Sequence, residues 1–103
     1  MAIYNKLVRN GVPEIIRERG QTPVWHVLKD DNGFLRALLD KDVEEGLELR
    51  DNPCLEELAD KMEVLLAIGR FLGYSPADIE QARAQKANQR GGFDHRIYLE
   101  SVD

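Results

Sequence analysis

Apolar residues recur every three or four positions through most of the chain, which is the spacing of amphipathic helices. Four segments show this pattern, and they span residues 13–19, 34–50, 53–72 and 76–89. Proline near the start of a segment and glycine after its end are common helix boundaries. Asn52 and Ser75 are placed to cap the third and fourth segments. The pattern therefore predicts a mainly α-helical protein with four helices.

Two short stretches near the chain ends have the composition of strands instead. Residues 23–28 are rich in β-branched and aromatic side chains, and residues 95–99 follow the Gly91–Gly92 turn. A strand needs a partner, and each stretch is the best partner for the other. Because two strands alone are only marginally stable, we expect a short β patch of residues 23–28 and 95–99, covered by helices.

The composition suits one small domain. A chain of 103 residues with 43% apolar content can close a single modest core, so we expect one domain over residues 1–103 and a homodimer that buries the remaining apolar faces. Cys54 is the only cysteine, which excludes an intramolecular disulfide and fits the reducing cytoplasm. The N-terminal residues are mixed and charged, and no apolar run is long, so we expect neither a signal peptide nor a membrane partner.

Negative charge is concentrated in the middle of the chain. The net charge of −5 argues against a nucleic-acid polymer as a partner. Residues 40–63 contain ten carboxylates and three basic side chains, a net charge of −7, while the rest of the chain carries +2. An acidic centre with basic ends suits a phosphate-bearing ligand bridged by a metal. A pair of solvated acidic helices would give the same count.

Two of these carboxylates fall in line with the apolar stripes of their helices. Glu45 has this position in the second helix and Glu57 has it in the third, and Glu48 and Asp60 follow each by three residues. Burying ionised carboxylates without partners costs several kcal/mol each. A hard divalent cation would offset that cost if the two helices face each other. We therefore expect Mg²⁺ or Mn²⁺ to bind four ligands: Glu45, Glu48, Glu57 and Asp60.

Two other interpretations of the acidic helices are disfavoured by the sequence. Most acidic runs are solvated helix faces, but the alignment with the apolar stripe disfavours that reading here. A di-iron carboxylate bundle requires Glu-x-x-His on its helices. Both histidines, His26 and His95, lie outside the expected helices, so Mg²⁺ or Mn²⁺ is preferred.

The order of the motifs resembles a known family. Residues 44–48 read Glu-Glu-x-x-Glu and residues 57–60 read Glu-x-x-Asp, which is similar to the metal-binding signature of the MazG-like all-α nucleotide pyrophosphohydrolases. Residues 4–10, 13–16 and 86–93 resemble a small branch of that superfamily that is often labelled phosphoribosyl-ATP pyrophosphohydrolase-like. The resemblance covers almost the whole chain and implies a four-helix MazG-like bundle.

The resemblance also implies an activity, which is hydrolysis of a nucleoside triphosphate or related nucleotide between the α and β phosphates. The products would be a monophosphate and pyrophosphate. It makes Glu44 the residue that orients or activates water, with Glu63 as the alternative. It assigns the substrate phosphates to four basic residues: Lys6, Arg9, Lys86 and Arg90.

Two residues depart from the family pattern. Asp42 stands where an apolar residue is expected, and Gly46 interrupts the metal-binding helix at a cost of about 1 kcal/mol relative to alanine. Both departures favour a catalytically silent helical dimer that binds nucleotide or serves as a scaffold. The complete set of four ligand carboxylates favours an enzyme, either a broad house-cleaning nucleotide hydrolase or a phosphoribosyl-ATP pyrophosphohydrolase of histidine biosynthesis.

Overall fold

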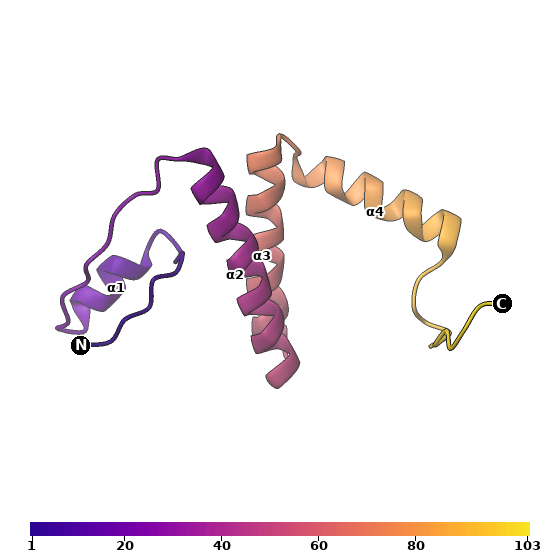
Figure 1. Cartoon of the computed structure of the whole chain (residues 1–103), viewed down its shortest axis with the longest axis horizontal. Coiled ribbons are helices and arrows are strands. Elements are labelled where there is room, and N and C mark those ends of the chain that lie inside the picture. Colours follow the sequence, from indigo (N-terminus) through magenta and orange to yellow (C-terminus); the bar gives the residue numbers. More distant parts are fainter.

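Four helices make up the regular structure of the chain (Figure 1). The computed structural model describes residues 1–103. Its helices are α1 (Val12–Glu18), α2 (Asp31–Asp51), α3 (Leu55–Leu72) and α4 (Pro76–Arg90). The mainly α-helical prediction is confirmed. Helices α2 and α3 form an antiparallel hairpin at the centre of the molecule, while α1 and α4 lie to either side of it.

The helix ends near α4 follow the capping signals in the sequence. Ser75 Oγ accepts a hydrogen bond from Asp78 N at 3.1 Å, and Asp78 Oδ2 accepts one from Ser75 N at 2.9 Å, which forms a capping box. At the end of α3, Gly73 has a φ of 90°, a conformation that glycine adopts without a steric penalty. The Gly73 and Tyr74 N–H groups then bond back to carbonyls of α3. The direction of α4 is therefore set by local chemistry.

The boundary between α2 and α3 differs from the prediction. The Asn52 N–H donates to Glu48 O at 3.0 Å, so this residue ends α2 instead of capping α3. Helix α3 begins only at Leu55, after Cys54. Helix α2 begins earlier than expected, because Asp30 caps it by accepting a hydrogen bond from Gly33 N at 2.9 Å. The acidic turn before Phe34 is thus the first turn of the helix.

The core of the hairpin lies near the end that holds the start of α2 and the end of α3. Leu38 and Val64 are buried there, and the rings of Phe34 and Phe71 meet edge to face with centroids 5.7 Å apart. Edge-to-face packing suits the opposite charges of the face and rim of an aromatic ring. The apolar stripes that the sequence predicted on the two helices do face each other. They hold the hairpin together at this end.

The β patch predicted for residues 23–28 and 95–99 is wrong, because the structure contains no strand. The first stretch belongs to the loop between α1 and α2, and the second lies beyond α4, on the opposite side of the hairpin (Figure 1). Strands pair only when their backbones lie about 4.8 Å apart. Since α4 leads away from the hairpin, it carries residues 95–99 out of reach of any partner.

The chain is open. Its radius of gyration is 17.6 Å, whereas a compact domain of this length has a value of about 13 Å. It exposes 9505 Å² of accessible surface, against about 5,900 Å² for a compact monomer of this mass. Both outer faces of the hairpin display apolar side chains at helical spacing: Leu39, Val43 and Leu47 on α2, and Leu55, Leu58, Met62 and Leu65 on α3.

No helix combines the length and the apolar character that a membrane crossing requires.

Candidate metal centre

Four carboxylates meet where α2 and α3 face each other, toward the connection between them. Glu45 and Glu48 come from the last turns of α2, and Glu57 and Asp60 come from the first turns of α3. One oxygen from each residue can be chosen so that all four lie within 4.8 Å of one another. The i, i+3 spacing on each helix brings the pairs together because the helices run antiparallel. The structure thus brings together the four residues that the sequence singled out as metal ligands.

Glu45 is the buried member of this cluster. Glu45 is only 6% exposed. Its Oε2 atom is buried without a hydrogen-bond partner, and the Oε2 atom of Glu57 is also buried without one. Burial raises the pKa of the Glu45 carboxyl, and the hydrogen bond and negative charge of Glu48 raise it further. Lys41 opposes this shift from 3.4 Å. A buried acceptor with no donor is unfavourable, so the cluster lacks a positively charged partner at this point.

The donor set and its spacing fit a hard divalent cation. Carboxylate oxygens are the ligands that Mg²⁺, Mn²⁺ and Ca²⁺ prefer. Opposite oxygens of a Mg²⁺ shell are about 4.2 Å apart, so the observed spread of up to 4.8 Å needs only small side-chain movements to close. Two oxygens in the cluster have no other partner. The four residues could therefore hold such an ion.

Three basic side chains surround the carboxylates. Lys6 Nζ lies 2.6 Å from Glu44 Oε1, Lys41 Nζ lies 3.2 Å from Glu44 Oε2, and Arg9 donates to Asp60 Oδ1 at 2.8 Å. Lys6 and Arg9 come from the nonhelical N-terminal segment, which these contacts tie to the hairpin. The four carboxylates of the cluster and Glu44 carry five negative charges when ionised. The three basic side chains offset three of them, which leaves a net of two negative charges around the cluster. One divalent cation would balance them.

The pair between Lys6 and Glu44 shifts the pKa of both groups. The hydrogen bond that Lys6 donates to Glu44 is the largest effect on Lys6 and raises the pKa of its ammonium group above the ordinary value of 10.5. Burial alone would raise the pKa of Glu44, but the hydrogen bonds from Lys6 and Lys41 outweigh it and hold the pKa below 4.5. Glu44 is therefore a carboxylate at neutral pH. It lies at the edge of the cluster, beside Glu45.

Lys61 explains one of the two residues that depart from the MazG-like pattern. This lysine of α3 lies across α2, where its Nζ is 2.6 Å from Asp42 Oδ1 and 3.0 Å from the Asp42 carbonyl oxygen. Asp42 is thus the partner of Lys61, and the contact joins the two helices beside the carboxylate cluster. A Cβ atom at Gly46 would lie 3.4 Å from the same Nζ, which is an ordinary contact distance, so the structure does not require glycine at that position.

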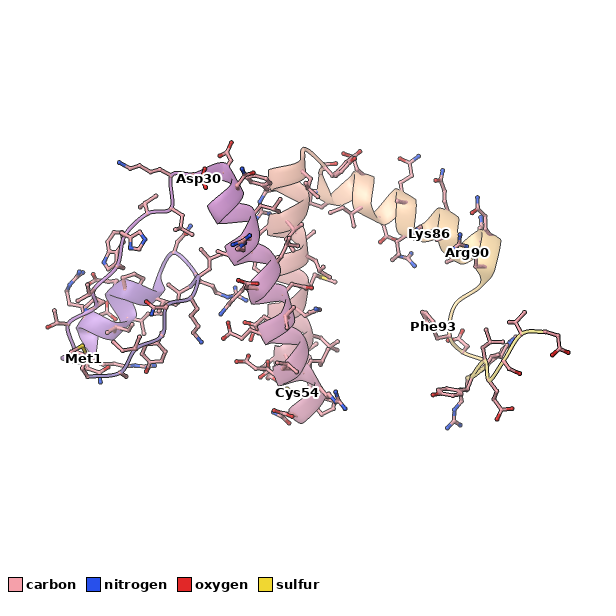
Figure 2. All side chains as sticks on the ribbon, viewed as in Figure 1. Met1, Asp30, Cys54, Lys86, Arg90 and Phe93 are labelled. Carbon is pink, nitrogen blue, oxygen red and sulfur yellow. The ribbon has the colours of Figure 1, made fainter.

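The other residues that were assigned to the site lie elsewhere. Glu63 is one turn beyond Asp60 and pairs with Arg70 at 3.7 Å, outside the cluster. Lys86 and Arg90 lie on the outer half of α4 (Figure 2). That helix leaves the hairpin at the end opposite to the carboxylates. Within one chain, neither Lys86 nor Arg90 reaches the cluster.

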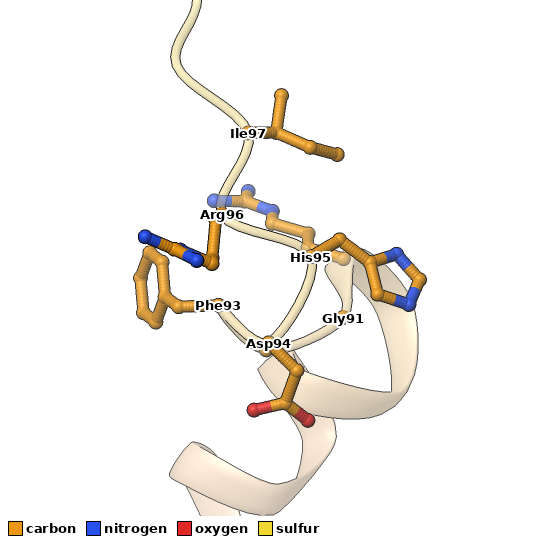
Figure 3. A pocket seen from close by; sticks show the side chains of 8 residues that line it. Gly91, Phe93, Asp94, His95, Arg96 and Ile97 are labelled. Atoms are coloured by element: carbon orange, nitrogen blue, oxygen red, sulfur yellow. The ribbon is translucent and has the colours of Figure 1, made fainter.

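A cavity at the C-terminal end of the chain is also separate from the carboxylates. It has a volume of about 330 Å³ and is lined by the eight consecutive residues from Arg90 to Ile97, which curl into a hook after α4 (Figure 3). A smaller cavity of about 100 Å³ lies between the N-terminal segment and α2, and Lys6, Lys41 and Glu44 line it. Of these two cavities, the smaller one borders the carboxylate cluster.

Sequence reasoning missed the two lysines that organise the cluster. Lys41 precedes Glu44 and Glu45 by three and four residues, which is the spacing of ion pairs on one helix face. That signal was available in the sequence. The role of Lys61 was not, because its pairing with Asp42 depends on how α2 and α3 are set against each other.

Comparisons of the chain with models of known protein families, with curated proteins and with solved structures find no match.

Proposed function

We propose that the protein is a metal-dependent nucleotide pyrophosphohydrolase of the MazG-like type. It would cleave a nucleoside triphosphate or related nucleotide between the α and β phosphates and release a monophosphate and pyrophosphate. The observation that carries the proposal is the convergence of Glu45, Glu48, Glu57 and Asp60, with buried oxygens that lack a partner. The sequence resemblance supplies the reaction, and the reducing cytoplasm is the expected compartment.

The residues around the cluster suit that reaction. Mg²⁺ or Mn²⁺ held by the four carboxylates would neutralise charge on the phosphates and lower the pKa of an attacking water. Glu44 remains ionised and can accept a hydrogen bond from that water, which would orient it. Lys6 and Arg9 present partly exposed cationic groups at the same edge, where phosphate oxygens could pair with them. Glu63 pairs with Arg70 and is not one of the four converging carboxylates, so Glu44 is the preferred residue for this role.

The two departures from the MazG-like pattern leave the four carboxylates available. Asp42 pairs with Lys61 of α3 next to the cluster, which gives this residue a structural role. At Gly46 a Cβ atom would make only an ordinary contact with Lys61 Nζ, so the structure does not require glycine there. The scaffold hypothesis rested on both residues, and Gly46 alone still favours it.

The assembly we propose is a homodimer of this chain. One chain exposes about 3,600 Å² more surface than a compact monomer of the same mass, so two copies have enough spare surface for an obligate interface, which buries about 2,000–5,000 Å² or more summed over both chains. The exposed apolar stripes on the outer faces of α2 and α3 have the spacing of a helix-packing seam. Two hairpins joined along these stripes would complete a four-helix bundle. A second copy of the chain is therefore the proposed occupant of this face.

The activity is tested with a panel of canonical and noncanonical nucleoside triphosphates and phosphoribosyl-ATP. Each is incubated with the purified chain in Mg²⁺ and then in EDTA, and pyrophosphate and orthophosphate are assayed separately. We expect pyrophosphate release that EDTA abolishes, with a monophosphate as the second product. Glu57→Gln and Asp60→Asn should each lower kcat at least 100-fold, because each removes a charged ligand, while the helical circular dichroism is retained.

Glu56→Gln is the matched control. It makes the same chemical change on the same helix, one residue away, at an exposed position outside the cluster. Its activity should remain close to that of the wild type. Full activity in both Glu57→Gln and Asp60→Asn would exclude the proposed centre. Release of orthophosphate alone would exclude the proposed bond.

A further inference from the structure

Two basic side chains of the N-terminal segment, Lys6 and Arg9, form ion pairs with carboxylates at or beside the proposed metal position. Arg9 holds Asp60, a proposed ligand, and Lys6 holds Glu44, next to the ligand Glu45. These two basic side chains are 58% and 39% exposed, whereas the third cation, Lys41, is only 15% exposed. Lys6 and Arg9 therefore sit at the solvent side of the cluster, where a polyphosphate would arrive.

We propose that Lys6 and Arg9 act as internal counter-ions that change partners. When the divalent cation binds, their side chains leave the carboxylates and pair with the substrate phosphates. This inference rests on the proposed function and deepens it by assigning the N-terminal segment a positioning role. Without the ion, the two side chains neutralise part of the cluster. Once the ion neutralises the same carboxylates, the attraction that holds Lys6 and Arg9 falls, and their charge becomes available to the phosphates.

The charges and contacts around the cluster favour this exchange. The cluster carries two negative charges in excess of its cations, so a bound divalent ion brings it to neutrality. A nucleoside triphosphate then adds further negative charge at the same edge, which the ion alone does not balance. Lys86 and Arg90 cannot help within one chain, because α4 points away. Lys6 and Arg9 are the exposed cations in contact with the cluster, and their segment has no helix to hold it in place.

Binding measurements on the metal-free, full-length chain test the exchange. Isothermal titration with MnCl₂ gives the affinity for the ion, and titration with inorganic pyrophosphate in excess Mn²⁺ gives the affinity for a polyphosphate, independent of any base. The variants are Arg9→Gln and Lys6→Gln. The control is Arg17→Gln, which removes the same charge from α1, where Arg17 pairs with Glu14.

The exchange requires effects of opposite sign in the two titrations. We expect Arg9→Gln and Lys6→Gln to bind Mn²⁺ about 3- to 10-fold more tightly than the wild type, because the carboxylates lose a competing cation. The same variants should bind pyrophosphate about 10-fold more weakly, because the phosphates lose a charged donor. A variant that merely damages the fold would weaken both affinities. Arg17→Gln should change neither.

The outcomes separate this inference from the metal centre itself. Unchanged or weaker Mn²⁺ binding in both variants would overturn the exchange while leaving the metal centre standing. Undiminished pyrophosphate binding in both variants would also overturn the exchange and leave the metal centre standing. A wild type that binds Mn²⁺ but no pyrophosphate would lead to the same conclusion. A wild type that does not bind Mn²⁺ would overturn the metal centre, and the exchange with it.

Discussion

Glu45 shows how one residue links stability to the proposed chemistry. Its position in the apolar stripe of α2 places a carboxylate in the interior, where burial and Glu48 raise its pKa. A buried charge that has too few partners destabilises the fold in the absence of a ligand. The same unsatisfied charge is what a divalent cation would bind. If the proposed metal centre is correct, this residue lowers the stability of the metal-free chain and raises its affinity for the ion.

The stability of the metal-free chain should depend on pH in two opposite ways. Because the folded-state pKa of Glu45 is raised above its ordinary value of 4.5, its protonation stabilises the fold at low pH, and that gain is lost as the pH rises through the raised value. Glu44 has a lowered pKa, so its contribution is present above 4.5 and is lost as the pH falls through its folded-state value. In the presence of a chelator, we expect the unfolding temperature to be higher at pH ~5 than at pH ~7.5. In stronger acid, we expect the unfolding temperature to fall again.

Glu45→Gln separates the contribution of this residue from all others. The variant keeps the shape of the side chain and removes the buried charge, so it should stabilise the metal-free chain by roughly 1–3 kcal/mol at neutral pH. It should also flatten the rise in unfolding temperature between pH ~7.5 and pH ~5. Differential scanning calorimetry measures both effects. A variant that is less stable than the wild type without metal would contradict the burial of an uncompensated charge.

At the scale of helices and turns, the sequence predicted correctly the features that depend on residues close together in the chain. The four helices and the capping box at Ser75 follow from periodicity and from side chains close in sequence. The convergence of Glu45 and Glu57 followed from the apolar stripes, because two stripes that pack together also bring together the residues in line with them. The prediction that Asn52 caps α3 is wrong, because its backbone N–H ends α2 and Cys54 is the N-cap of α3.

The arrangement of segments that are far apart in the sequence could not be predicted from the pattern of apolar and polar residues. The β patch failed because residues 23–28 and 95–99 have strand-like composition, but the direction of α4 separates them. Lys86 and Arg90 were assigned to the phosphates by resemblance, and the same helix direction keeps them away from the carboxylates of their own chain. Neither separation can be read from composition or spacing. Both depend on the turn at Gly73 and on how closely α4 approaches α3.

Two glycines in the hairpin test how closely its elements pack. At Gly46 a methyl group would make an ordinary contact with Lys61 Nζ at 3.4 Å, so Gly46→Ala should stabilise the fold by about 1 kcal/mol through helix propensity alone. At the buried Gly69 a Cβ atom would lie 2.5 Å from Ile79 Cδ1 of α4. Ile79 must then move, and overpacking of this kind costs roughly 1–3 kcal/mol.

Gly69→Ala should therefore range from neutral to about 2 kcal/mol destabilising, since the gain in propensity only partly offsets the clash. Urea denaturation followed by circular dichroism at equal protein concentration gives both values. Equal stabilisation by Gly46→Ala and Gly69→Ala would show that α4 does not pack against α3 at Gly69.

At the scale of the whole molecule, the hairpin exposes apolar side chains at helical spacing on both of its helices. The hairpin buries its inner stripes, Leu38 and Val64 among them, while its outer stripes face solvent. Large exposed apolar patches mark interaction sites in soluble proteins, and this is why we propose the homodimer. The radius of gyration of 17.6 Å is large because α1 and α4 extend from the hairpin without a core of their own. A second copy would supply the missing layer.

Sedimentation equilibrium of the wild type should therefore give a mass of at least two chains at micromolar concentration. Leu47→Glu on α2 and Met62→Glu on α3 each place a charge within an outer stripe. An unpaired charge in such an interface costs several kcal/mol, so each variant should raise the dissociation constant by at least 100-fold. Gln21→Glu, which adds the same charge at an exposed loop position, is the control. A monomeric wild type would exclude the dimer, and association that both charged variants leave unchanged would place the interface on another face of the molecule.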